Sequence, residues 1–196
     1  MTAHRIKQVA LVHFAEYGYE GTSLSKIAQE VGIKKPSIYA HFKSKEDLFM
    51  QILQDAFKLE LDVCSAFFQE HQGQRIAWQL KTYLYNYLSR YQQQDELRFM
   101  LRMTFCPPAP VEEAVLTQVY HFLDNLEHHL VPIIGQALRN GEIAGIHPEQ
   151  AATAFMCMLD GLFAELLYGG EERFKRKLEA SWLVYWRGLT LQADNV

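Results

Sequence analysis

The sequence predicts an all-α protein with a small N-terminal domain and a larger C-terminal one. Apolar residues recur at helical spacing through most of the chain, and no segment alternates apolar and polar residues as a half-buried strand does. Glycines and prolines fall between these periodic segments, where helices end. With 196 residues, 49% of them hydrophobic and 21% charged, the chain is long and apolar enough to bury a sizeable core.

The first two helices are marked by residues that begin and end helices. Apolar residues at helical spacing predict a helix over residues 5–17, and Gly18 then ends it. Thr22 or Ser23 offers a side-chain oxygen that caps a second, short helix, and Gly32 ends that helix. The turn around Gly32 separates the second helix from the third.

The third and fourth helices begin at equally plain signals. Pro36 suits a first helical position, where its missing N–H costs nothing, and it opens a helix that extends through Phe42. Ser44, followed three residues later by Asp47, predicts a capping box. The fourth helix begins at this box and is expected to end near Gln69.

The rest of the chain is also predicted to be helical. Pro132 lies inside the longest of these segments and predicts a kink, and Gly141 caps that segment. We place the domain boundary inside the fourth helix, which gives a first domain of residues 1–47 and a second of residues 48–196. The remaining helices are predicted over residues 74–93, 95–105, 111–140, 149–168 and 171–192.

Charge is distributed unevenly along the chain. The net charge is −4, but residues 1–45 alone carry +4 and residues 46–196 carry −8. A basic N-terminal part on an acidic body predicts that only the N-terminal part contacts a polyanion such as nucleic acid.

Composition and motifs predict a cytoplasmic protein with no membrane span and no catalytic activity. Cys64, Cys106 and Cys157 are too widely spaced for a disulfide framework or a CxxC metal pair, which is typical of a reducing compartment. The most apolar stretch, residues 151–168, is interrupted by two acidic residues. The sequence contains no GxSxG, P-loop, GxGxxG or HExxH motif, so we expect neither an enzyme nor a resident cofactor or metal ion.

The segment from Gly21 to Leu48 is the most informative part of the chain. Its two short helices around a tight turn form a helix-turn-helix arrangement, in which Ile27 and Ile38 supply apolar contacts between the helices. The second helix of the pair presents hydrogen-bond donors to solvent, as expected of a helix that enters the major groove of DNA. These donors are Lys34, Lys35, Ser37, Tyr39 and His41.

This segment resembles the DNA-binding domain of TetR-like transcriptional repressors. The family's motif contains a threonine pair, Ile-Ala, Gly-Val, and a later run of the form Tyr-x-x-Phe-x-x-Lys-x-x-Leu. The resemblance implies a homodimer that binds a double-stranded DNA operator and leaves it when a small-molecule effector binds. The matching residues here are Thr22-Ser23, Ile27-Ala28, Gly32-Ile33, Tyr39, Phe42, Lys45 and Leu48.

The resemblance also implies a set of DNA contacts. Thr22 and Ser23 would grip phosphate through their hydroxyls and the free N–H groups of a helix start. Lys45 would add its charge at the start of the fourth helix. Tyr39 and His41 would contact the sugar-phosphate backbone. The candidates for reading bases are Lys34, Lys35 and Ser37. The full set is Thr22, Ser23, Ser25, Lys26, Lys34, Lys35, Pro36, Ser37, Tyr39, His41, Lys43 and Lys45.

The last two helices are predicted to form the dimer interface. Residues 149–168 are apolar on more sides than one subunit covers, and two copies of this helix pair would make a four-helix bundle. Asp160 and Glu165 would either pair across this interface or face a cationic ligand. The candidate interface residues are Asp160, Leu178, Trp182, Tyr185 and Trp186.

A ligand cavity is predicted in the larger domain. Its central helices carry more large, adaptable side chains than a core needs, and such walls suit a small apolar or amphipathic effector. Tyr120 and His121 are the candidate polar anchors. The predicted lining residues are Trp78, Phe99, Met103, Tyr120, His121, Phe155 and Phe163.

Other kinds of regulator stay open as alternatives. His121, Asp124 and His128 lie at i, i+3 and i+7 on one helical face, with His129 beside them, which would suit a metal sensor. A redox sensor would act through Cys106. A transcriptional activator is the alternative to a repressor.

Overall fold

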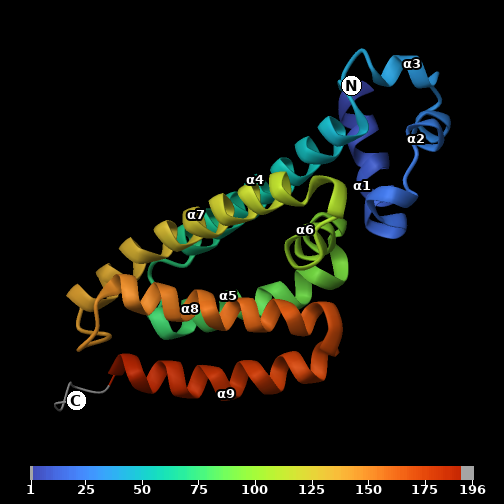
Figure 1. Cartoon of the computed structure of the whole chain (residues 1–196). Helices are drawn as coiled ribbons and strands as arrows, with labels where there is room; N and C mark the ends of the chain where they lie inside the picture. Colours follow the sequence, from blue (N-terminus) through green and yellow to red (C-terminus); the bar gives the residue numbers. More distant parts are fainter. Residues whose placement is uncertain (1, 191–196) are drawn as a thin grey trace. The chain divides into compact units, whose positions relative to one another are not determined.

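The structure is a computed structural model of the chain, and it describes residues 2–190 (Figure 1). Within these residues all regular elements are helices, which confirms the predicted fold class. The chain packs as two compact units. The N-terminal unit contains residues up to 60 together with 93–121, and the C-terminal unit contains residues 61–92 together with those from 122 onward. The predicted boundary between residues 47 and 48 separates domains by expected function and not by packing. It therefore stays a prediction.

Two helices, α4 and α7, contribute to both units. The N-terminal unit is built from α1 (Thr2–Gly21), α2 (Leu24–Val31), α3 (Lys35–Ile38), the first part of α4 (Lys45–Glu70), α6 (Asp95–Phe105), the short helix η1 (Ala109–Val111) and the first part of α7 (Glu112–Arg139). The C-terminal unit is built from the rest of α4 and α7, with α5 (Ile76–Gln93), α8 (Pro148–Ala164), the π-helical turn η2 (Glu165–Gly169) and α9 (Gly170–Thr190).

Glycines in the left-handed region end the helices where the sequence predicts. Gly18 interrupts α1 with a φ of 72°, and Gly32 ends α2 with a φ of 79°. At the end of α7, Gly141 has a φ of 74° and donates its N–H to the Leu138 carbonyl. A side chain at these positions would strain the backbone, so glycine fixes each helix end. The predicted end of the last helix, Gln192, lies outside the described residues.

Capping side chains start α2 and α4. The Ser23 hydroxyl accepts the N–H of Lys26 at 3.3 Å, so Ser23, and not Thr22, caps α2. Ser44 accepts the N–H of Asp47 at 3.0 Å, and the Asp47 carboxylate accepts the N–H of Lys43 at 2.7 Å. These two bonds satisfy donors at the start of α4 as a capping box does.

The third helix is shorter than predicted. α3 ends at Ile38 rather than at Phe42. The N–H groups of His41 and Phe42 both point to the carbonyl of Ile38, at 2.9 and 3.0 Å, so the chain turns there instead of continuing the helix.

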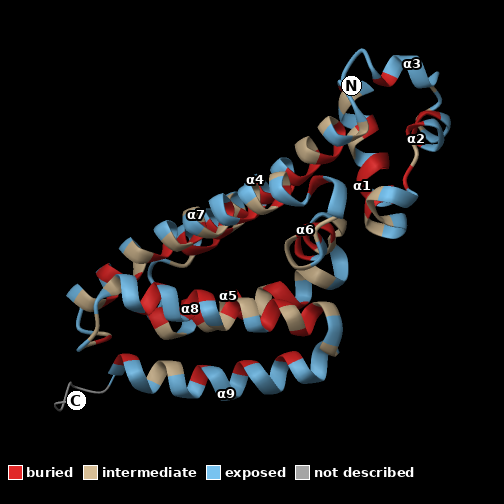
Figure 2. Cartoon of the chain, in the orientation of Figure 1, coloured by how far each residue is buried: buried red, intermediate tan, exposed pale blue. Residues whose placement is uncertain are grey.

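Each unit has its own aromatic core, and burial follows the inward faces of the helices (Figure 2). In the N-terminal unit the rings of Phe14, Phe49 and Phe99 meet, with centroids 5.0 Å apart for the first two and 5.5 Å apart for the last two. In the C-terminal unit the rings of Tyr87 and Phe163 lie 4.7 Å apart. These edge-to-face pairs hold their helices together.

Among residues 2–190, one stretch is apolar enough to cross a membrane by length and composition. It is an 18-residue window within Pro148–Thr190 with a mean hydropathy of 1.4, and 50% of it is buried inside the protein. Because the core helix of a soluble protein passes the same test, this stretch is weak evidence for a membrane span.

Candidate nucleic-acid interface

The helix-turn-helix pair, α2 and α3, has an apolar interior. Ile27 and Ile38 are fully buried, and Phe42 in the turn after α3 is 2% exposed. These side chains fix the two helices against each other, as the sequence predicts. The exposed side of the pair is therefore held on a rigid base.

That exposed side carries most of the predicted DNA contacts. Tyr39 and His41 lie just beyond α3, in the turn that follows it, and the side chain of Tyr39 is 51% exposed. Ser23 and Lys45 are half-buried. The predicted contacts that are exposed are Ser25, Lys26, Lys34, Lys35, Pro36, Ser37, Tyr39, His41 and Lys43.

Thr22 is an exception, because the structure buries it. Its side chain is 2% exposed, and its hydroxyl lies 2.9 Å from the His13 carbonyl oxygen and 2.7 Å from that of Gly18. The single hydrogen of the hydroxyl is therefore directed to carbonyls of α1, and the hydroxyl does not face a phosphate. The expectation that Thr22 contacts DNA is corrected on this ground.

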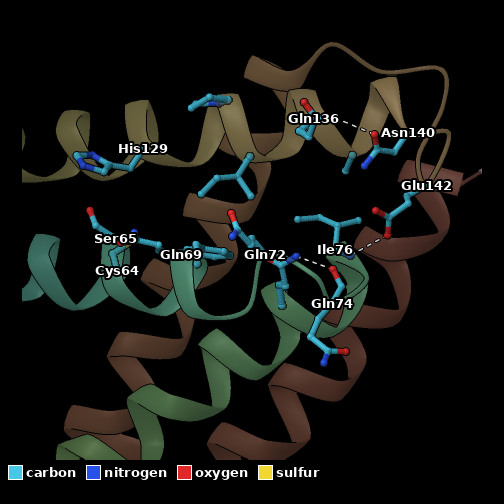
Figure 3. Close-up of a pocket in the computed structure, with 15 residues that line it drawn as sticks. Cys64, Ser65, Gln69, Gln72, Gln74, Ile76, His129, Gln136, Asn140 and Glu142 are labelled. Atoms are coloured by element: carbon cyan, nitrogen blue, oxygen red, sulfur yellow. Dashed lines mark hydrogen bonds between the residues drawn. The ribbon is translucent and has the colours of Figure 1, made fainter.

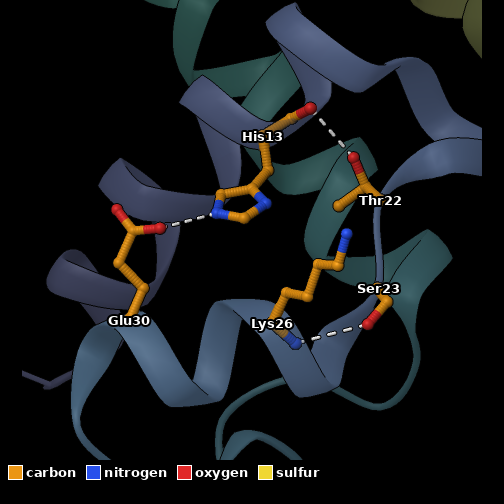
Figure 4. A network of polar contacts seen from close by, with 5 residues as sticks. All are labelled: His13, Thr22, Ser23, Lys26 and Glu30. Carbon is orange, nitrogen blue, oxygen red and sulfur yellow. Dashed lines mark hydrogen bonds and ion pairs between the residues drawn. The ribbon is translucent and has the colours of Figure 1, made fainter.

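A buried histidine ties α1 to α2 (Figure 4). His13 is 7% exposed, and its Nε2 lies 2.7 Å from a carboxylate oxygen of Glu30. The other ring nitrogen, Nδ1, is buried with no hydrogen-bond partner in the described part of the chain. The pair fixes the last turn of α2 near the middle of α1. Sequence reasoning missed it, because a histidine and a glutamate 17 residues apart give no local signal.

Two tyrosines on either side of the break at Gly18 hold two of the predicted DNA-contacting lysines. The Lys45 ammonium lies 4.4 Å from the centre of the Tyr19 ring, and that of Lys26 lies 5.8 Å from the centre of the Tyr17 ring. Partial burial lowers the pKa of Lys45, and the same cause raises the pKa of Tyr19. Each ring face attracts its cation, so both lysines are held at defined positions on this surface.

In the C-terminal unit, α8 and α9 leave one face uncovered. Val184 on α9 is 73% exposed and Leu183 is 52% exposed. Beyond the first turn of α8, which exposes Glu149 and Gln150, the exposed residues of this helix are small, namely Thr153, Ala154, Cys157 and Gly161. A shallow hollow between the two helices is lined by Ala154, Met158, Ala180, Ser181, Val184 and Tyr185.

The predicted interface residues divide between this face and the interior. Leu178 is fully buried and Trp182 is 8% exposed, so both pack inside their own subunit. Tyr185 and Trp186 are half-buried, and the Tyr185 hydroxyl donates to the Ala151 carbonyl at 3.0 Å. Asp160 is also half-buried, and burial raises the pKa of its carboxyl.

Glu165 finds its partners within its own subunit. Arg173 donates its Nε–H to the carboxylate at 2.8 Å, and the Lys177 ammonium donates to the other oxygen. These two hydrogen bonds lower the pKa of Glu165 to about 2. The side chain folds over Gly169, where an added Cβ would clash with a carboxylate oxygen of Glu165. Glu165 therefore closes the turn between α8 and α9 rather than facing a ligand or a partner subunit.

The side chains predicted to line a ligand cavity do not lie together. Phe99 packs on Phe49 in the N-terminal unit, whereas Phe155 packs on Tyr185 in the C-terminal unit. Met103 and Phe163 are buried, Trp78 is 44% exposed, Tyr120 is 64% exposed and His121 is exposed. The exposure of Tyr120 and His121 contradicts their expected role as anchors inside a cavity. A pocket does exist in the C-terminal unit, but it is lined by other residues.

The histidines of α7 hydrogen-bond along their own helix. The Nδ1 of His128 lies 2.6 Å from the Asp124 carbonyl oxygen, and that of His129 lies 2.8 Å from the Asn125 carbonyl oxygen. Across residues 2–190, no three His, Cys, Asp or Glu side chains come close enough together to hold a metal ion. Cys106 and Cys157 are exposed, and Cys64 is buried.

The fold and its exposed donors define a helix-turn-helix protein with a helical body. Residues 6–52 match the family described as "Bacterial regulatory proteins, tetR family". The chain is also 38% identical over 53 residues to the biofilm operon icaADBC HTH-type negative transcriptional regulator IcaR of Staphylococcus epidermidis. That match spans 27% of this chain and 29% of the relative, less than a third of either. Over these residues the chain is therefore similar to the helix-turn-helix part of tetR-family regulators.

Solved structures extend the similarity to the whole fold. A candidate TetR-family transcriptional regulator from Mesorhizobium loti MAFF303099 has a TM-score of 0.76 and 20% identity, and the alignment covers 97% of both chains. The transcriptional regulator FadR from Bacillus subtilis, in complex with stearoyl-CoA, has a TM-score of 0.71 and 17% identity, with 94% of this chain and 98% of that chain covered. At these identities the likeness concerns the fold alone.

Proposed function

We propose that this protein is a cytoplasmic transcriptional regulator that binds a palindromic DNA operator as a homodimer and represses transcription until a small molecule releases it. The observation that carries the proposal is the row of exposed donors on and after α3, on a segment that matches the tetR family over residues 6–52. No catalytic step is part of the proposal.

The helix-turn-helix pair would bind one operator half-site per subunit. α3 is only four residues long, so its exposed lysines and Ser37 would reach base edges in the major groove from a single turn of helix. Tyr39 and His41, in the turn after it, would contact the sugar-phosphate backbone. Lys45, placed over the Tyr19 ring at the start of α4, would contact phosphate.

The uncovered face of α8 and α9 would form the dimer. Small residues on α8 let a second helix approach closely, and Val184 with Leu183 supplies the apolar area that α9 exposes. Two copies of this face would form a four-helix bundle with an isologous interface. Tyr185 and Trp186 would lie at its edge, whereas Leu178 and Trp182 would support it from inside.

An effector would act through the C-terminal unit. FadR was solved with stearoyl-CoA bound, so this fold accommodates a small molecule in at least one protein. Any such ligand lowers operator affinity only to the extent that it prefers the state that does not bind DNA. α4 runs unbroken from Lys45 to Glu70 and belongs to both units, so we propose it as the element that a ligand moves. A metal-sensing, redox-sensing or activating regulator is the alternative.

The experiment is a DNA-binding titration with matched variants. An operator is selected from random duplexes, and its affinity for the full chain is measured by fluorescence anisotropy at several salt concentrations. Lys45→Ala should weaken binding to all duplexes and reduce the salt slope by about one unit. Lys35→Ala should relax preference at particular base pairs instead.

Lys58→Ala is the control, because Lys58 is exposed on α4 outside the candidate interface and should change neither quantity. Failure to select any duplex, or a Lys45→Ala variant with unchanged affinity and slope, would contradict the proposed interface.

A further inference from the structure

The C-terminal unit contains a pocket that the sequence does not predict (Figure 3). Its volume is about 440 Å³, within the range of small-molecule sites. The last turns of α4, the loop after it, the start of α5 and the second half of α7 form its walls. All of its lining residues belong to this one unit.

The rim of the pocket carries carboxamides and a hydroxyl. Ser65, Gln69 and Gln72 are exposed at its edge (Figure 3). Within residues 2–190, neither Gln69 nor Gln72 has a hydrogen-bond partner for its side chain, so both amides remain available. A carboxamide donates through its nitrogen and accepts through its oxygen, which is the pairing that a ligand hydroxyl needs.

Two further polar groups line the same space. The Nδ1 of His129 lies 2.8 Å from the Asn125 carbonyl oxygen, which leaves its Nε2 as the ring nitrogen available to a ligand. One carboxylate oxygen of Glu142 accepts the N–H of Ile76 at 2.8 Å, and the second oxygen is a further acceptor. Both residues line the pocket.

The inner wall of the pocket is apolar. Phe68, Ile76 and Ala137 are each no more than 5% exposed and line it from α4, α5 and α7 respectively. A ligand that lies against this wall therefore needs one apolar face. The pocket combines that wall with a rim of neutral polar groups.

We propose that this pocket is the effector site and that it takes a neutral molecule with several hydroxyl groups and one apolar face, such as a saccharide. None of its lining residues is a lysine or an arginine, and Glu142 repels carboxylates and phosphates, so an anionic ligand lacks a partner there. A purely apolar ligand would leave the rim groups desolvated without hydrogen bonds. The effector role rests on the proposed function, whereas the binding chemistry does not. Of the two kinds of effector that the sequence predicts, apolar or amphipathic, this assignment favours the amphipathic kind.

The test uses defined probes on the full chain. Glucose, maltose and sorbitol are titrated at millimolar concentrations, with decanoate as the anionic apolar probe, and the side-chain NH₂ resonances of Gln69 and Gln72 are followed by NMR. At least one neutral probe should shift both resonances saturably, and decanoate should shift neither. Gln72→Leu should weaken the neutral probe about fivefold, because one neutral hydrogen bond is lost. Ser65→Trp should abolish binding by filling the opening.

Gln54→Leu is the matched control, since Gln54 is an exposed carboxamide on α4 that does not line the pocket, and it should bind the probe as the parent does. Shifts caused by decanoate alone, or no shift with any probe, would overturn the assignment. Operator affinity is measured on the same protein without probe. Loss of DNA binding would contradict the proposed function, and the probe titration would still report on the pocket.

Discussion

Replacing Thr22 by valine separates a role in the fold from a role in DNA binding. Valine keeps the shape of the side chain but removes the hydroxyl that reaches the carbonyls of His13 and Gly18 at 2.9 and 2.7 Å. The site is 2% exposed, so water does not readily replace the lost hydrogen bond. A buried acceptor left without a partner costs about 1–3 kcal/mol. In a chain of this size a loss of about 2 kcal/mol lowers the Tm by roughly 4–8 °C.

The assay is thermal unfolding of Thr22→Val and the parent, followed by operator titrations at a temperature where both are folded. We expect the lower Tm, with operator affinity and salt slope close to those of the parent. Ser25→Ala removes an exposed hydroxyl from the same segment and should leave the Tm unchanged. If Thr22→Val keeps the parent Tm and instead flattens the salt slope by about one unit, Thr22 contacts phosphate and our reading of its burial is wrong.

Three further predictions concern positioning, assembly and pH. Tyr19→Leu should weaken operator binding about threefold, because it removes the ring that holds Lys45. Tyr19→Phe keeps the ring and should keep the parent affinity, and fluorescence anisotropy measures the operator affinity of both variants. Val184→Arg should yield a monomer in sedimentation, while Tyr120→Arg, at another exposed site, should leave the dimer intact. Glu165 has a pKa of about 2 against an ordinary value of 4.5, so it stabilises the fold above pH 4.5 and loses that effect as pH falls toward 2. Unfolding at a series of pH values should therefore show a steeper acid loss for the parent than for Glu165→Gln, and equal slopes would contradict the ion pairs.

The helix-turn-helix pair was predictable because its signals are local. Ser23, Gly32 and Ser44 each act on backbone groups within a few residues, so their roles follow from spacing alone. The role of Thr22 was misassigned because its hydrogen-bond partners are on α1, as far as nine residues back. Thr22 and Ser23 both carry a hydroxyl that can cap a helix, so the sequence does not show which of them does so. Partners that are distant in sequence also explain why the pairing of His13 with Glu30 was not predicted. The contacts of Lys26 and Lys45 with tyrosine rings were missed for the same reason.

The residues predicted to line one ligand cavity do not lie together, and the sequence failed to show this for a different physical reason. Large aromatic residues at helical spacing satisfy a packed core and a cavity wall equally well, and only the three-dimensional arrangement decides between them. Here Phe99 and Phe163 each meet other rings at close range, so their bulk fills space instead of enclosing it. The pocket is instead rimmed by glutamines near a helix end, a residue type that sequence reasoning assigns to solvent. The second half of α7 does line the pocket at helical spacing, with residues 129, 132, 133, 136 and 137, but a packed core face has the same spacing, so periodicity alone does not indicate a pocket.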